Sequence, residues 1–140
     1  MRSFHISIFI WLFFFLATGS LARSAKAKTH PNDPDYSAAL AAANRFLHAW
    51  QTEDHETGIV MLSDAARQHA SPEFLQNFFS PGPQAAFEIG HGHRRSRGEY
   101  EFPIVLFRSS ANSSHPQECR IVLVRAKRDD WEVEKLPGSL

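Results

Sequence analysis

The chain has 140 residues, with 15 lysines and arginines, 15 aspartates and glutamates, and a formal net charge of zero. This length accommodates one domain, and the balanced charge excludes the strong basic excess that is typical of nucleic-acid-binding proteins. We therefore expect one small domain that has no nucleic-acid partner.

The N-terminus has the pattern of a cleaved signal peptide. An uncharged apolar run at 6–17 follows Arg2, and its length of about 12 residues is short of the roughly 20 that a membrane-spanning helix needs. Small residues then occupy the positions that signal peptidase recognises before a cut after Ala22 or Ala27. We expect residues 1–22 to be a signal peptide, or 1–27 in the alternative, and the protein to be periplasmic or secreted without a stable membrane anchor.

Residues 23–35 contain two prolines, several charges and almost no apolar side chains, which predicts a flexible lead-in before a single domain at 36–137. At the start of that domain, residues 37–50 (SAALAAANRFLHAW) repeat apolar side chains at helical spacing. This pattern predicts the first helix.

Capping residues indicate two more helices. Asp54 can accept the free N–H groups of a first helical turn, and we expect the second helix to run from it through GIVML and to end between residues 63 and 69. The sequence Ser71-Pro72-Glu73 supplies a hydroxyl cap, a proline at the first helical position and an early acid, so it predicts a short third helix.

After the third helix the apolar pattern changes from helical to alternating, which predicts strands at 85–93, 99–108, 119–127 and 131–136. We expect the last two strands to form a hairpin. Pro103 lacks an N–H group, so it predicts a sheet edge or a bulge at its position. Helices followed by strands favour an α+β fold, with the helices packed on a mostly antiparallel sheet of four or more strands.

The segment FLHAWQTEDHETGIVML (46–62) joins a helix that ends in an aromatic residue to a capping acid and a second apolar helix, and the chain closes with WEVEKL (131–136). In these features it resembles the nuclear transport factor 2-like superfamily, which includes polyketide cyclases and ketosteroid isomerases of the SnoaL type. The resemblance implies helices in the concave side of a strongly curved sheet, around a cone-shaped pocket. Phe46 stands where the isomerase branch has an oxyanion-binding tyrosine, and Ala70 where it has a general-base aspartate, so the resemblance argues against that chemistry.

Eight apolar side chains are expected on the concave side, either lining a pocket or filling a solid core. They are Phe46, Trp50, Phe87, Ile89, Tyr100, Phe102, Ile104 and Trp131. Apolar pockets with few polar groups are typical of ligand sites. The sequence therefore favours a non-catalytic domain that binds a small apolar or amphipathic ligand, or a protein partner, and a homodimer stays open.

The alternative function is an isomerase, cyclase or hydrolase that acts on a small apolar substrate. Such an enzyme needs a titratable pair that faces the pocket, and the candidates are His48, Tyr100 and His91. None of them belongs to a recognisable catalytic motif.

His91 and His93 would share one face of a strand, a geometry that can seat a metal ion. A metal site needs at least one further ligand, and the sequence forces none into place. Arg94, Arg95 and Arg97 also repel a divalent cation. We therefore expect no metal site and no cofactor.

Two further expectations concern the thiol of Cys119 and glycosylation at Asn112. Cys119 is the only cysteine, so it cannot form a disulfide within the chain, and its place at the start of an apolar strand predicts a buried, inert thiol. Asn112 begins a glycosylation sequence that matters only in a eukaryotic secretory host.

We predict that the full-length chain, expressed in a bacterial host, is exported and cleaved so that the mature protein begins at Arg23 or Lys28. Intact-mass measurement of the purified protein identifies the cut. A membrane-embedded product that still begins at Met1 would show that the apolar run is an anchor.

Overall fold

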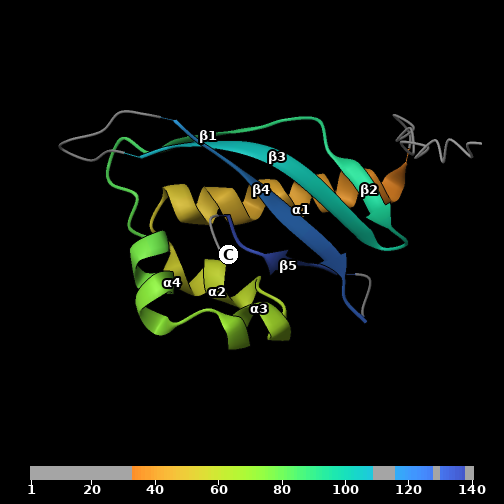
Figure 1. The fold of residues 1–140 in the computed structure, drawn as a ribbon, viewed down its shortest axis with the longest axis horizontal. Helices are drawn as coiled ribbons and strands as arrows, with labels where there is room; N and C mark the ends of the chain where they lie inside the picture. Colours follow the sequence, from red (N-terminus) through yellow and green to blue (C-terminus); the bar gives the residue numbers. More distant parts are fainter. Residues whose placement is uncertain (1–32, 109–115, 128–129, 138–140) are drawn as a thin grey trace, which may run out of the picture.

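The computed structural model describes residues 33–108, 116–127 and 130–137. The expected signal peptide, most of the expected lead-in and Asn112 lie outside these ranges. The helices are α1 (Pro34–Gln51), α2 (His55–Val60), α3 (Asp64–His69) and α4 (Pro72–Phe78), and the strands are β1 (Ala86–Ile89), β2 (His93–Ser96), β3 (Glu99–Phe107), β4 (Gln117–Arg125) and β5 (Trp131–Lys135) (Figure 1). Within the described ranges, no helix has both the length and the apolar character to cross a membrane.

The strands form one curved antiparallel sheet in the order β1-β3-β4-β5, and β2 also pairs with β3. Helix α1 lies along one face of this sheet, and α2, α3 and α4 gather at one end of the molecule (Figure 1). This arrangement confirms the predicted α+β fold and the β4–β5 hairpin. In this description the inner face of the sheet is the one that contacts α1, and the outer face is the opposite one.

Helix α1 begins at Pro34, earlier than the expected domain start at Tyr36. Asp33 caps the helix because its carboxylate accepts a hydrogen bond from the backbone N–H of Asp35 at 3.0 Å. Proline at the first helical position needs no hydrogen-bond partner for its nitrogen. The last residues of the expected lead-in therefore belong to the helix.

The expected second helix is two helices, because the backbone between them joins the sheet. The N–H of Ser63 donates to the carbonyl of Val133, and the N–H of Val133 donates to the carbonyl of Met61, each at 2.9 Å. These bonds form a single parallel β-bridge between Leu62 and Val133, at the free edge of β5. The Ser63 hydroxyl then caps α3 by accepting from the N–H of Ala66 at 3.0 Å.

The expected strand 85–93 is also interrupted, at Gly90-His91-Gly92 between β1 and β2. A Cβ atom at Gly90 would lie 2.9 Å from the Pro103 ring, and one at Gly92 would lie 2.3 Å from the Phe102 ring. Pro103 faces this break from the central strand β3 and accepts a hydrogen bond from the N–H of Gly90 at 2.8 Å. The expected irregularity is therefore present, but not at a sheet edge.

Glycine is required at a second close approach, where α2 crosses the core. A Cβ atom at Gly58 would lie 2.1 Å from Cζ of Phe79. Phe79 is fully buried and packs edge-on against Phe46 of α1, with ring centroids 5.7 Å apart. The missing side chain at Gly58 thus lets α2 sit directly on the aromatic core.

We predict that Gly58→Ala lowers the free energy of unfolding by about 1–3 kcal/mol, because the added methyl overpacks the core. Alanine is the better helix former, so a loss of stability identifies a steric cause. Urea denaturation measures the change, and Phe79→Leu supplies the matched background. The loss should shrink in that background, whereas equal losses in both backgrounds would contradict the packing argument.

Candidate functional site

A polar cluster lies where the N-terminus of α1 meets the inner face of β3. The Tyr100 hydroxyl donates a hydrogen bond to the Asp33 carboxylate at 2.5 Å. Burial and this hydrogen bond raise the pKa of Tyr100 to about 12. The same bond is the main cause that lowers the pKa of Asp33. At neutral pH the phenol is therefore protonated and the carboxylate is ionised.

Two arginines surround this pair and hold Asp35 in the first turn of α1. Arg125 forms an ion pair with the Asp35 carboxylate, and Arg94 lies 3.5 Å from its other oxygen. The Arg94 guanidinium also sits over the Tyr100 ring, at 5.6 Å from the centroid. The cluster joins the helix start to the sheet, and neither Tyr100 nor Asp33 is held in a state that exchanges a proton near neutral pH.

The structure brings two of the three catalytic candidates to this cluster. The ring of Tyr36 lies 5.7 Å from that of Tyr100 and 5.5 Å from that of His91, between centroids. The Tyr36 hydroxyl also forms a hydrogen bond with Nδ1 of His91 at 3.3 Å. His48 lies instead on the exposed side of α1.

The expectation that His91 and His93 share a face is wrong, because the strand is interrupted between them. His91 contacts Tyr36 of α1, whereas His93 pairs with Glu101 on the outer face, at 3.8 Å between Nε2 and Oε1. Across the described parts of the chain, no three histidine, cysteine or acidic side chains are grouped in a way that could hold a metal ion.

The side chains that were expected on the concave side form a packed core. Six are at most 5% exposed, namely Phe46, Trp50, Tyr100, Phe102, Ile104 and Trp131. Phe87 and Ile89 are partly buried and pack against this core. The rings contact one another and those of α4, so the space between α1 and the sheet is filled.

A groove of about 690 Å³ lies between the α3–α4 corner and the outer face of the sheet. Its apolar lining comes from Ala65, Ala66, Ala70, Phe74, Val122 and Leu136, and its polar lining from His69, Ser71, Arg95, Glu99, Glu134 and Lys135. Sequence patterns did not indicate this groove, because the corner exists only where residues 61–63 leave the helical path to pair with β5.

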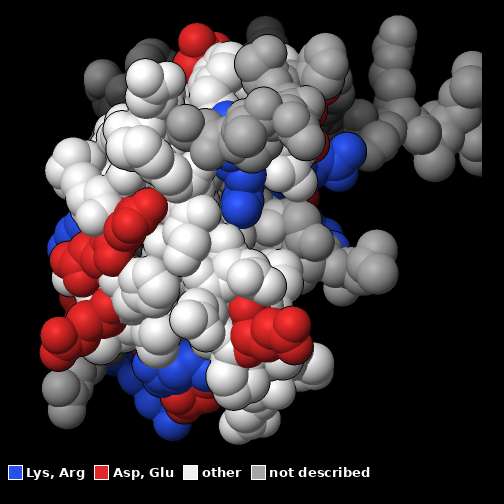
Figure 2. Space-filling model, turned by 90° about the vertical axis from the view of Figure 1, so that its left-hand side faces the viewer, with Lys and Arg blue, Asp and Glu red and all other residues white. Residues whose placement is uncertain are grey.

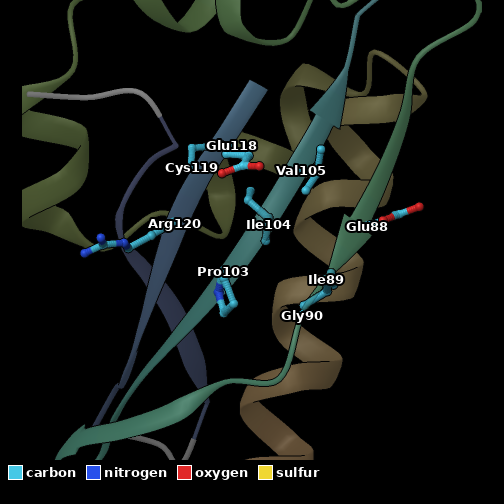
Figure 3. Close-up of a pocket in the computed structure, with 9 residues that line it drawn as sticks. All are labelled: Glu88, Ile89, Gly90, Pro103, Ile104, Val105, Glu118, Cys119 and Arg120. Atoms are coloured by element: carbon cyan, nitrogen blue, oxygen red, sulfur yellow. The ribbon is translucent and has the colours of Figure 1, made fainter. Parts of the chain in front are cut away.

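A second cavity, of about 400 Å³, crosses β1, β3 and β4 around Pro103 (Figure 3). Ile89 and Ile104 are among its lining residues, so two of the expected pocket residues do border a cavity. Figure 3 shows the charged ends of Glu88 and Arg120 pointing away from Pro103. The lining also includes Glu118, so the cavity combines backbone and apolar groups with an acidic side chain.

The fold is similar to solved structures at low sequence identity. A ketosteroid isomerase-like protein from Erwinia carotovora atroseptica matches 77% of this chain and 99% of its own, with 13% identity and a TM-score of 0.53. A SEC-C motif-containing protein from Psychrobacter arcticus matches 75% of this chain and 63% of its own, with 10% identity and a TM-score of 0.52. No protein-family model and no curated protein sequence matches the chain. These likenesses concern the fold alone, and the match to the ketosteroid isomerase-like protein agrees with the fold that the sequence predicted.

We predict that Tyr100 ionises only near pH 12, against an ordinary value of 10.0. Tyr36→Phe removes the other of the two tyrosines, so the ultraviolet absorbance of phenolate then reports Tyr100 alone. Because the pKa is raised in the folded state, the linked stability is present below pH 10 and is lost as the pH rises towards 12.

Asp33→Asn is the matched control for this titration. It should bring the pKa of Tyr100 down from about 12 without restoring the ordinary value, because burial is the larger cause of the shift. A transition near pH 10 in the Tyr36→Phe protein would contradict the Tyr100–Asp33 bond.

Proposed function

We propose that this chain is an exported, non-catalytic domain that binds a small apolar or amphipathic ligand in the groove between the α3–α4 corner and the outer face of the sheet. One observation carries the proposal. Val122 lies on the outer face, because it pairs with Glu101 of β3, yet it is only 3% exposed. The groove thus gives the outer face a buried apolar floor.

The size and lining of the groove fit a small ligand. Its volume of about 690 Å³ falls within the range of about 300–1,000 Å³ that is usual for such sites. Its charged groups balance one another in number, because Arg95 and Lys135 stand against Glu99 and Glu134, and Arg95 lies 3.2 Å from Glu99. An uncharged or amphipathic molecule would therefore meet an apolar floor and a balanced polar rim.

The polar cluster at α1 supports binding over acid–base catalysis. A general acid or base works best with a pKa near the working pH, and the environments of Tyr100 and Asp33 move their pKa values away from neutrality. Among the described residues, aromatic side chains pack between α1 and the sheet beside these groups and occupy the space that a substrate would need. Export remains part of the proposal on the N-terminal pattern.

We predict that the mature domain binds the neutral fluorescent probe N-phenyl-1-naphthylamine in the groove and that Ala70→Phe weakens binding by about tenfold, equivalent to about 1.4 kcal/mol. Ala70 lines the groove and ends α3 with an extended backbone, φ −87° and ψ 123°, which accepts a large side chain. The phenyl ring would occupy the space that the probe needs. Fluorescence titration measures both affinities.

Ala41→Phe is the control, because Ala41 is exposed on α1 and does not line the groove. It adds the same ring to the surface and should leave the probe affinity unchanged. Equal affinities for the parent and Ala70→Phe proteins would place any binding outside the groove.

A further inference from the structure

We propose that Arg108 forms a second binding site, for a small oxyanion. The site lies on the inner face of the sheet, at the end of β3 that is remote from Tyr100. Side chains alternate between the two faces along β3, and Tyr100, Phe102, Ile104 and Leu106 form its buried inner row. Arg108 directly follows this strand and continues the row. A positive charge therefore stands at the edge of an apolar core.

Aromatic rings surround the Arg108 guanidinium. Its central carbon lies 5.8 Å from the ring centroid of Trp50 and 5.8 Å from that of Phe78. These contacts stabilise the cation, but they also remove water from it, and this burial lowers the pKa of Arg108. Nε of Arg108 and Nε1 of Trp50 are both buried without a hydrogen-bond partner within the described structure.

Arg108 has no counter-ion among the described residues. None of the ion pairs there includes it, and its hydrogen bond to the carbonyl of Asn77 is long, at 3.4 Å. The nearby Cys119 thiol cannot supply a negative charge at neutral pH, because burial raises its pKa. The sequence that follows Arg108, SSANSSH (109–115), contains no acidic residue.

Other arginines of the sheet, unlike Arg108, form ion pairs. Arg94 and Arg125 both pair with Asp35, and Arg95 and Arg120 both pair with Glu101. A partly buried charge without a partner is costly, so an anion from outside the chain would gain strongly by binding at Arg108. On the face that carries α4, Figure 2 shows separate acidic groups among uncharged side chains, together with basic groups, and at the bottom of the view an acidic group lies against a basic one.

Carboxylate and phosphate are the groups that match this site. A guanidinium presents its N–H donors in a planar fork, which two oxygens of one anion can accept together. Trp50 itself is fully buried, so the guanidinium is the group expected to contact the anion, and the Trp50 ring lies beside it. The ligand is therefore expected to carry an oxyanion.

This site is separate from the groove of the proposed function. The groove uses Ser71 and Phe74 at the start of α4, whereas Arg108 contacts Asn77 and Phe78 at its end. A neutral probe in the groove does not require Arg108, so either proposal can fail alone.

The test is a titration of the mature domain with acetate and with inorganic phosphate, at constant ionic strength maintained by chloride. We expect one or both anions to raise the Tm to a plateau, and Arg108→Gln to weaken that binding by at least about tenfold. A response to acetate alone identifies a carboxylate ligand, and a response to phosphate alone identifies a phosphorylated one. Arg45→Gln, at an exposed position on α1, should bind as the parent does.

A second readout keeps the test decisive if Arg108→Gln does not fold. In a mature Trp131→Phe protein, Trp50 is the only remaining tryptophan if the signal peptide with Trp11 has been removed. Its fluorescence should change with the same anion dependence as the Tm. No anion-specific change in either signal, or an equal response in the Arg108→Gln protein, would overturn the proposal.

Discussion

The carboxylate of Asp33 joins the two layers of this fold. It accepts one hydrogen bond from the backbone N–H of Asp35 and another from the hydroxyl of Tyr100. One side chain therefore caps α1 and connects that cap to the central strand β3. A helix start needs an acceptor for its free N–H groups, and a buried phenol needs a partner for its hydroxyl. Because one group meets both needs, the start of α1 is fixed at the Tyr100 end of the inner row. The helix then runs along the inner face until Trp50 reaches Arg108 at the other end.

The two ends of that inner row differ in their charge balance, and the difference bears on where a ligand would bind. At one end the Tyr100 hydroxyl donates a hydrogen bond to the Asp33 carboxylate, and two arginines form ion pairs with Asp35. Between the ends, the aromatic side chains fill the space, which is the solid core that the sequence left open as the alternative to a lined pocket. At the far end, the contacts that the described residues make with the Arg108 guanidinium come from two aromatic rings and a carbonyl, and none of them is an ion pair. Among the described residues, this packing is compatible with the two proposed sites, the outer groove and the far end of the inner row.

Local patterns in the sequence predicted the elements whose causes are local. Helix α1 and helix α4 follow from apolar spacing and from the Ser71-Pro72 cap, and β3, β4 and β5 follow from alternation. The division of α2 from α3 has a distant cause, because Met61 and Ser63 exchange hydrogen bonds with Val133. The groove depends on that division, so no local pattern could indicate it. Alternation along β3 does place Arg108 on the inner face, but only the tertiary structure shows that no acidic side chain among the described residues pairs with it.

The sequence Gly90-His91-Gly92-His93 shows how a distant steric contact changes the meaning of a motif. Read as a continuous strand, its spacing puts both imidazoles on one face, where they suggest a metal site. The glycines instead leave room for the rings of Pro103 and Phe102, which approach from the neighbouring strand. Those approaches interrupt the strand, and alternation no longer relates the two histidines. His91 then contacts Tyr36 of α1, whereas His93 pairs with Glu101 on the outer face of the sheet. The two glycines of this motif therefore decide where its two histidines lie.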